Sequence, residues 1–299
     1  MSYVPLKYHN PYSLDLKADT DGLNGYFDQT NQRPLPRCHP NEPPICRPDY
    51  QVGKQEALEV SMGEYSTAGL KALNRDFYGA YLPKEPELTN KGIALALADG
   101  INTSQVSHIA SEIAVKSFLD DYFATNNDLT VKQAALQVLR SINLWLNSQS
   151  RCFDLRFDLT SSYLCGFSAM ILKDRYAHLF HVGDSRIYLL REGKLRQLTH
   201  DHLLEAAADE HKLSRALGFS NFPDLDVHSL EILPGDLFML ISDGVHPYID
   251  EEVVNRYVTL LPDDLPTVAT ALVQHALNRG SEDNMTVQLI RVDRMKNRV

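Results

Sequence analysis

The sequence has little of what would build a disulfide scaffold, a membrane span or a secretion signal. Its four cysteines have neither a CxxC spacing nor the density of a disulfide-rich domain, so we interpret them as free thiols. No stretch approaches the roughly 20 apolar residues that a membrane-spanning helix requires, and the first residues lack a basic segment followed by an apolar run. These absences predict a globular protein without a membrane span, located in the cytoplasm.

Positively charged residues are also scarce. The chain has 29 Lys and Arg against 39 Asp and Glu, which gives a formal net charge of -10. Such a field repels nucleic-acid backbones and anionic lipid surfaces, so nucleic acid is not an expected partner. Phosphorylated substrates remain compatible, because a bound divalent cation can reverse the sign of the potential inside one cleft.

Prolines are concentrated near the N-terminus and divide the chain into two parts. The segment RPLPRCHPNEPPICRP forbids a continuous helix or a central strand. We therefore predict that residues 1–56 form a Pro-rich extension that is poorly ordered or draped over the surface. A PxxP ligand for a partner domain, within RPLP, is the alternative. From residue 57 to 299 the pattern is regular, and the length of the chain allows one large domain or two small ones.

The first regular elements are a buried strand and two helices. In KGIALALADG, large apolar residues alternate with alanines up to Asp99 and Gly100, which predicts a buried strand that ends in an acidic turn. An amphipathic helix follows a cap at Thr103 or Ser104. A second helix is expected over residues 130–148, and the short link between the two predicts an antiparallel pair.

Strands then dominate, before a second pair of helices. The segments SSYLCGFSAMIL, RYAHLFHV, RIYLLR and KLRQL predict an antiparallel meander, and DLFMLI and MTVQLIRV predict two later strands. Between these two lie two helices, the second beginning near Asp264 and ending at Gly280. Blocks of strands and pairs of helices predict an α+β fold with antiparallel sheets.

Four aspartates stand where an apolar strand meets a turn. Singly, each is typical of an ordinary turn residue. Together they suggest a metal site, because carboxylates on rigid strand ends hold hard divalent cations. Mn²⁺ or Mg²⁺ fits such ligands, and the lack of His and Cys clusters disfavours structural zinc. The four are Asp99 in LALADG, Asp184 in FHVGDSR, Asp243 in MLISDG and Asp283 in SEDNMTV.

The order of five short motifs resembles the metal-dependent protein phosphatase family, the type 2C phosphatases, over about residues 57–299. The likeness is nearest to the phosphatase half of bacterial fused kinase-phosphatase proteins. No kinase Gly-rich loop or HRD motif is present, so a separate Ser/Thr kinase would phosphorylate the substrate. The motifs are NRD at residues 74–76, ADG at 98–100, GDSR at 183–186, SDG at 242–244 and EDN at 282–284.

The resemblance implies a four-layer αββα sandwich, in which two antiparallel sheets face each other between helical pairs and a metal cleft lies at one edge. By motif, Asp99 would bridge two ions and the Gly100 carbonyl would bind one of them. Asp243 and Asp283 would complete the other ion's shell. Asp76 would support the same cluster, directly or through water.

The resemblance also implies a third ion and a reaction. Asp184 matches a third, weaker metal position, in which Asp243 can share. The implied activity is hydrolysis of phosphoserine and phosphothreonine in proteins by water activated between the two ions, without a phosphoenzyme.

Three departures from the family pattern concern phosphate binding and proton transfer. Lys71 stands where the family usually has a phosphate-gripping arginine, so it keeps the charge and loses the bidentate fork. Arg75 replaces the glutamate of NED and either contacts phosphate or faces solvent. Ser104 stands where the family has a histidine proposed to protonate the leaving group. The nearby His108 is interpreted as a surface or packing residue, so the general acid stays unassigned.

Other histidines invite a metal interpretation that the pattern disfavours. His178 and His181 lie on opposite faces of one strand, so we interpret both as structural. His200 and His202, in HDH, are expected to face solvent, since nothing nearby completes a site. We hypothesise that residues 203–222 form a mobile segment that borders the cleft and affects substrate choice.

Two functions from different classes remain open at this stage. The four strand-end aspartates favour an active phosphatase. The altered NRD and DGINTS segments favour a catalytically silent regulatory or phosphoprotein-binding domain. Hydrolysis of a small-molecule phosphate is a third, weaker possibility, since it rests only on the generality of two-metal chemistry.

Overall fold

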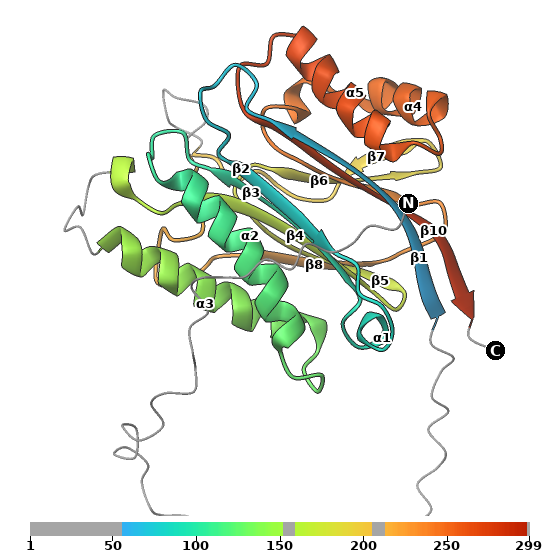
Figure 1. The fold of residues 1–299 in the computed structure, drawn as a ribbon, viewed down its shortest axis with the longest axis horizontal. Coiled ribbons are helices and arrows are strands. Elements are labelled where there is room, and N and C mark those ends of the chain that lie inside the picture. The colour runs from blue at the N-terminus through green and yellow to red at the C-terminus, as the bar shows by residue number, and fades with distance from the viewer. Residues whose placement is uncertain (1–55, 152–158, 205–212, 298–299) are drawn as a thin grey trace, which may run out of the picture. The chain divides into compact units, whose positions relative to one another are not determined.

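Two antiparallel sheets lie face to face, and a pair of helices covers the outer face of each (Figure 1). The computed structural model describes residues 56–151, 159–204 and 213–297. These residues belong to one compact unit, residues 54–299. The predicted extension lies outside the described residues except for Glu56, and the domain division stays a prediction.

The first sheet has the strand order β2-β3-β4-β5-β8 and every neighbouring pair is antiparallel. We call it the β3 sheet. Its strands are β2 (Asp76–Tyr81), β3 (Ile93–Gly100), β4 (Cys165–Lys173), β5 (Tyr176–Val182) and β8 (Asp226–Glu231).

The second sheet, which we call the β10 sheet, has the order β1-β10-β9-β6-β7 and is also antiparallel. The edge strands are therefore β1 and β7 in this sheet and β2 and β8 in the β3 sheet. The strands are β1 (Glu56–Thr67), β10 (Met285–Asn297), β9 (Leu237–Ile241), β6 (Arg186–Arg191) and β7 (Lys194–Gln197).

Strand β3 shows how the sequence specifies the layers. Its large residues, such as Leu95 and Leu97, face the β10 sheet and pack in one core with Phe238 and Leu240 of β9. Its alanines face outward into a second core. Since alternate strand residues point to opposite faces, this one strand builds two cores. The small alanines allow a helix to approach the sheet closely.

That helix is α2 (Ser107–Ala124), which packs with α3 (Val131–Arg151) on the β3 sheet. The predicted cap of α2, Thr103 or Ser104, lies two or three residues before the observed N-cap, Val106. The Ser104 hydroxyl accepts a hydrogen bond from the Val106 amide at 3.2 Å, ahead of the helix, and the helix itself has no side-chain cap. The short helices of the chain that the structure describes are α1 (Glu87–Lys91), η1 (Leu159–Ser161) and η2 (His246–Tyr248).

The outer face of the β10 sheet is covered by α4 (Glu251–Leu260) and α5 (Leu265–Asn278), which form the third core. The predicted start of α5 is confirmed, because the Asp264 carboxylate accepts a hydrogen bond from the Thr267 amide at 3.1 Å. The predicted α+β sandwich of four layers is therefore confirmed. Among the described residues, no helix has the length and apolar character needed to cross a membrane.

Candidate active site

Four of the predicted aspartates lie at the strand ends along one edge of the sandwich. Asp76 begins β2 and is the direct antiparallel partner of Asp99, the next-to-last residue of β3. Asp184 occupies the turn between β5 and β6, and Asp243 follows the end of β9. Asp99 hydrogen-bonds Asp243, and both Asp76 and Asp184 lie near enough to act on its charge. The fold thus gathers carboxylates that are up to 167 residues apart in the chain, between Asp76 and Asp243.

Burial, together with the repulsion among the carboxylates, raises the pKa values of this cluster. Burial is the largest cause, and it raises the pKa of Asp76 to about 7 and that of Asp184 to about 8. The negative charge of Asp243 adds to both shifts. Burial followed by the charges of Asp243, Asp76 and Asp184 raises the pKa of Asp99 well above 3.8. The cluster is therefore electrostatically costly when all its members are ionised.

Two buried oxygens of this cluster have no hydrogen-bond partner among the described residues. They are Asp76 Oδ1 and Asp99 Oδ2. A buried carboxylate oxygen without a partner is costly, and a cation is the group that would compensate it. In the described part of the chain, no three His, Cys, Asp or Glu side chains are already arranged to hold one metal ion. The donor chemistry, hard oxygen ligands with unmet negative charge, nevertheless fits Mn²⁺ or Mg²⁺.

The other oxygen of Asp76 is held by the opposite sheet. The Thr286 hydroxyl on β10 donates to Asp76 Oδ2 at 2.6 Å. The Thr286 amide in turn donates to the Ser242 hydroxyl at 2.9 Å. The serine of SDG thereby fixes the threonine that orients the aspartate of NRD. This chain of contacts joins β2, β9 and β10 at the edge where the carboxylates meet.

Asn284 organises the loop that leads into Asp76. Its side-chain amide donates to the backbone carbonyls of Ala68 and Leu73, both at 3.0 Å. Its carbonyl oxygen accepts from the Arg75 amide at 2.8 Å, and its own amide donates to the Asp283 carboxylate at 2.8 Å. The side chain is 3% exposed, so these bonds have little competition from water. Sequence reasoning missed this role, for which the only signal was the asparagine that follows Asp283 in the EDN motif.

Two motif glycines are required by close packing at the site. A Cβ at Gly244 would lie 2.0 Å from the Asn284 carbonyl oxygen. A Cβ at Gly100 would lie 2.9 Å from the backbone of Ser107, the first residue of α2. Glycine therefore lets the SDG turn approach EDN and lets the ADG turn approach the helix.

Comparison with known proteins identifies the family. The sequence profile described as protein phosphatase 2C matches residues 72–289, a range that contains all five motifs. The chain belongs to the protein phosphatase 2C family. The serine/threonine phosphatase stp of Listeria welshimeri serovar 6b is 28% identical over 233 residues, which are 73% of this chain and 89% of that protein.

Solved phosphatase structures have the same fold. The Ser-Thr phosphatase MsPP of Mycobacterium smegmatis, solved with cacodylate, has a TM-score of 0.61 and 25% identity, and the match covers 78% of this chain and 98% of that one. The catalytic domain of the phosphatase PstP, solved with two manganese ions, has a TM-score of 0.62 and 25% identity over 78% of this chain and 97% of that one.

Within this phosphatase 2C domain, Lys71 and Asp283 form the rim of the site. Lys71 Nζ lies 3.6 Å from Asp283 Oδ2, and the Asn102 side chain donates to the same oxygen at 3.0 Å. Lys71 therefore brings positive charge to the edge of the carboxylate cluster. The carbonyl of Arg75 accepts from the Gly100 amide at 3.2 Å, and its buried Nε has no hydrogen-bond partner among the described residues.

Ser104, at the position of the family's histidine, has a structural role. Its hydroxyl donates to the Ser162 carbonyl at 2.7 Å, and the side chain is buried. The Ser104 hydroxyl therefore donates its proton to the backbone and does not replace the histidine as a proton donor. His108 is half-buried, and its Nδ1 has no hydrogen-bond partner in the described part of the chain. No contact places it at the carboxylates, so the general acid stays unassigned.

The histidines of the central strands differ partly from expectation. His178 contacts Ser229 at 2.8 Å and His181 contacts Ser168 at 2.9 Å, as expected of structural residues. His200 is exposed. The expectation that its neighbour His202 also faces solvent is wrong, because His202 is 6% exposed. The loop that contains His202 packs against Gly183, in the turn before Asp184. A contact between residues 19 positions apart cannot be predicted from a local sequence pattern.

The raised pKa values predict that the metal-free protein loses stability as the pH rises. Asp76 and Asp184 have folded pKa values of about 7 and about 8, against about 4 in an unfolded chain. Between these limits the folded state binds more protons than the unfolded state, so the free energy of unfolding falls with rising pH. We expect Tm in chelator to fall by about 5 °C or more from pH 5 to pH 8. Asp184→Asn should flatten this slope in thermal unfolding, whereas a Tm that rises over the window would contradict the electrostatic account.

Proposed function

We propose that the carboxylate cluster at the strand ends is the catalytic centre of a protein serine/threonine phosphatase. The observation that carries this proposal is the gathering of Asp76, Asp99, Asp184 and Asp243 at one edge, with two buried oxygens that have no hydrogen-bond partner among the residues that the structure describes. Membership of the phosphatase 2C family supports the reaction class. The substrates are phosphoserine and phosphothreonine side chains in proteins.

The cluster would hold two divalent ions, Mn²⁺ or Mg²⁺, with room in the ligand set for a third. Asp99 and the Gly100 carbonyl, with Asp243 and Asp283, would provide the ligands of the two main ions, and Asp184 those of the third. Asp76 would support the cluster. Bound divalent ions supply the charge that acidifies an attacking water and neutralises the transferring phosphoryl oxygens.

The chain's own residues would position this chemistry. Phosphoryl transfer depends mainly on geometry and electrostatics, so residues that fix the carboxylates matter as much as the carboxylates themselves. Thr286 fixes Asp76, and Asn284 fixes the loop that contains Lys71. Lys71, at the rim beside Asp283, would place a positive charge against the substrate phosphate.

The partners and the location remain proposals. We infer that the substrates are phosphoproteins made by a separate Ser/Thr kinase, and that both proteins act in the cytoplasm. The relatives support the phosphoprotein substrate class by their names alone. The silent regulatory domain is the alternative that the altered NRD and DGINTS segments would favour.

Metal dependence of turnover tests the proposal directly. The purified protein should hydrolyse p-nitrophenyl phosphate and a phosphothreonine peptide with manganese or magnesium, and a chelator should remove this turnover because it takes away the ions that would acidify the attacking water. Excess metal should restore it. A folded protein that binds manganese by calorimetry and hydrolyses neither substrate would instead be the silent domain.

A further inference from the structure

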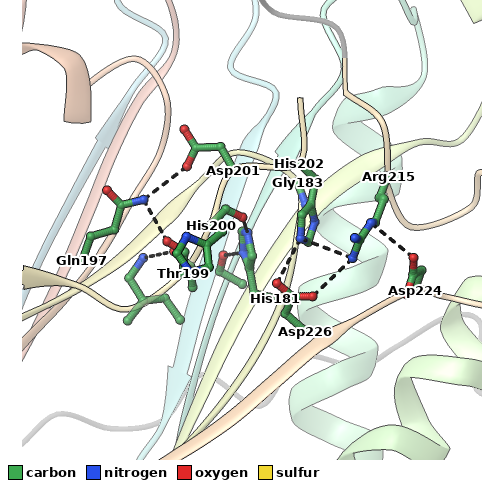
Figure 2. A network of polar contacts seen from close by, with 12 residues as sticks. His181, Gly183, Gln197, Thr199, His200, Asp201, His202, Arg215, Asp224 and Asp226 are labelled. Carbon is green, nitrogen blue, oxygen red and sulfur yellow. Dashed lines mark hydrogen bonds and ion pairs between the residues drawn. The ribbon is translucent and has the colours of Figure 1, made fainter. Parts of the chain in front are cut away.

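His202 joins the turn that contains Asp184 to two other segments of the chain (Figure 2). Its Nδ1 accepts a hydrogen bond from the Gly183 amide at 3.2 Å. Its own backbone amide donates to the Gly183 carbonyl at 2.8 Å. One residue thus binds both polar groups of the glycine that immediately precedes Asp184.

The two ring nitrogens of His202 have different roles. Because Nδ1 accepts from a backbone amide, it cannot carry a proton, so the neutral ring has its proton on Nε2. Nε2 lies 3.1 Å from Asp226 Oδ2, which is an acceptor for that proton. The carboxylate of Asp226 therefore holds the ring in the tautomer and orientation that Gly183 needs, as outer residues do for the ligands of metal sites.

Asp226 extends this link to a third segment. Arg215 Nη1 donates to Asp226 Oδ1 at 3.2 Å, and Arg215 Nε lies 3.2 Å from Asp224. Arg215 Nη1 is also 3.5 Å from His202 Nε2, but both atoms carry protons, so the arginine acts through the carboxylate that the two share. The Ser214 amide donates to the His202 carbonyl at 2.8 Å. Ser214 is thus bonded directly to the histidine, and Arg215 is linked to it through Asp226.

The same segment is fixed on its far side. Leu217 and Cys165 exchange two backbone hydrogen bonds, of 2.9 Å and 3.4 Å. The Asn147 side chain of α3 donates to the Gly218 carbonyl at 2.7 Å, and Asn143 accepts from the Gly218 amide at 2.9 Å. In residues 213–222, the backbone is therefore anchored on β4 and α3. This part of the segment that we hypothesised to be mobile is instead built onto the fold.

Neighbouring residues hold the loop around His202 independently of the hydrogen bond from Gly183 to its ring. The ring centroids of His181 and His202 lie 5.0 Å apart. Burial, and next the positive charge that His202 can carry, lower the pKa of His181 to about 4, so His181 is neutral near pH 7. Next to His202, Asp201 is held by a two-pronged ion pair with Arg186. The loop is therefore anchored on both sides of the histidine, and loss of the His202 side chain need not release it.

On the proposed function, we propose that His202 is a positioning residue for the Asp184 side of the catalytic centre, with its ring oriented by Asp226. Asp184 is the next residue after the glycine that His202 binds. Its own carbonyl accepts from His246 Nε2 at 3.1 Å, so the turn is held from both directions. A shift of Gly183 would move the Asp184 carboxylate relative to Asp99 and Asp243.

Isosteric substitutions separate the two nitrogens. In His202→Asn, the side-chain oxygen can take the place of Nδ1 and accept from Gly183. In His202→Gln, the amide reaches toward Asp226 but leaves the Gly183 amide without its acceptor. His202→Leu removes both contacts, and His200→Gln, at an exposed histidine two residues away, is the matched control.

We expect His202→Gln and His202→Leu to need about tenfold more manganese for half-maximal turnover, whereas His202→Asn and His200→Gln stay near wild type. Manganese affinity by calorimetry and hydrogen exchange at the Gly183 amide should follow the same order. These two readouts do not need turnover, so they test the inference even if the proposed function fails. The inference is overturned if His202→Asn and His202→Gln behave alike in metal affinity and Gly183 exchange, or if all three variants only lower Tm.

Discussion

Asp99→Asn should reduce metal-dependent phosphatase turnover by roughly 10³-fold or more. Asp99 is the carboxylate on which the charges of Asp76, Asp184 and Asp243 all act, and its Oδ2 is buried without a partner in the described part of the chain. Asparagine keeps the shape and removes the charge that a bridging ligand must supply. The measurement is hydrolysis of a phosphothreonine peptide across a manganese titration.

The same substitution should leave the metal-free fold intact or more stable at pH 8, because it removes one of several repelling carboxylates. Thermal unfolding in chelator therefore distinguishes a lost ligand from a damaged fold. Asp128→Asn, at an exposed position between α2 and α3, changes the net charge equally and should leave turnover unchanged. Full activity in Asp99→Asn would remove Asp99 from the catalytic centre.

The layers of the fold could be read from the sequence because strand periodicity is a local signal. In β3, alternating large and small residues specify one face for the opposite sheet and one face for α2. The positions of the aspartates followed from the same logic, since each stands at a strand end. That Asp76 and Asp99 are direct partners depends on register, which the hydrophobic pattern sets only once both strands are known to be neighbours.

The residues that position the site could not be found in this way. Asn284 binds Ala68, which is 216 positions away, and His202 binds Gly183 through a loop that returns to the strand end. Such contacts join segments far apart in the chain, so the spacing of apolar residues along the sequence does not predict them. The sequence also could not show what Ser104 does at the family's histidine position, because its hydroxyl donates to the backbone carbonyl of Ser162, 58 residues away.

Asn284→Asp should lower both turnover and Tm, with an effect on turnover second to that of Asp99→Asn. It replaces one atom of a side chain that is not a metal ligand in our proposal. The new carboxylate oxygen would face the carbonyls of Ala68 and Leu73, to which the amide now donates at 3.0 Å. Two backbone carbonyls would lose their donor and meet a negative charge, which costs about 3 kcal/mol or more. We expect Tm to fall by about 6 °C or more.

Turnover should fall further than stability alone explains, by about 100-fold at temperatures where the variant is folded, because the loop before Asp76 would move. The aspartate could still accept from the Arg75 amide, so the fold should survive. Asn278→Asp, at the exposed end of α5, makes the same chemical change without buried partners and should match wild type in both measurements. A folded Asn284→Asp variant with normal turnover would show that the loop from Ala68 to Arg75 does not position the catalytic carboxylates. Loss of turnover at 20 °C, far below its Tm, would instead place the EDN asparagine among the residues on which the catalytic geometry depends.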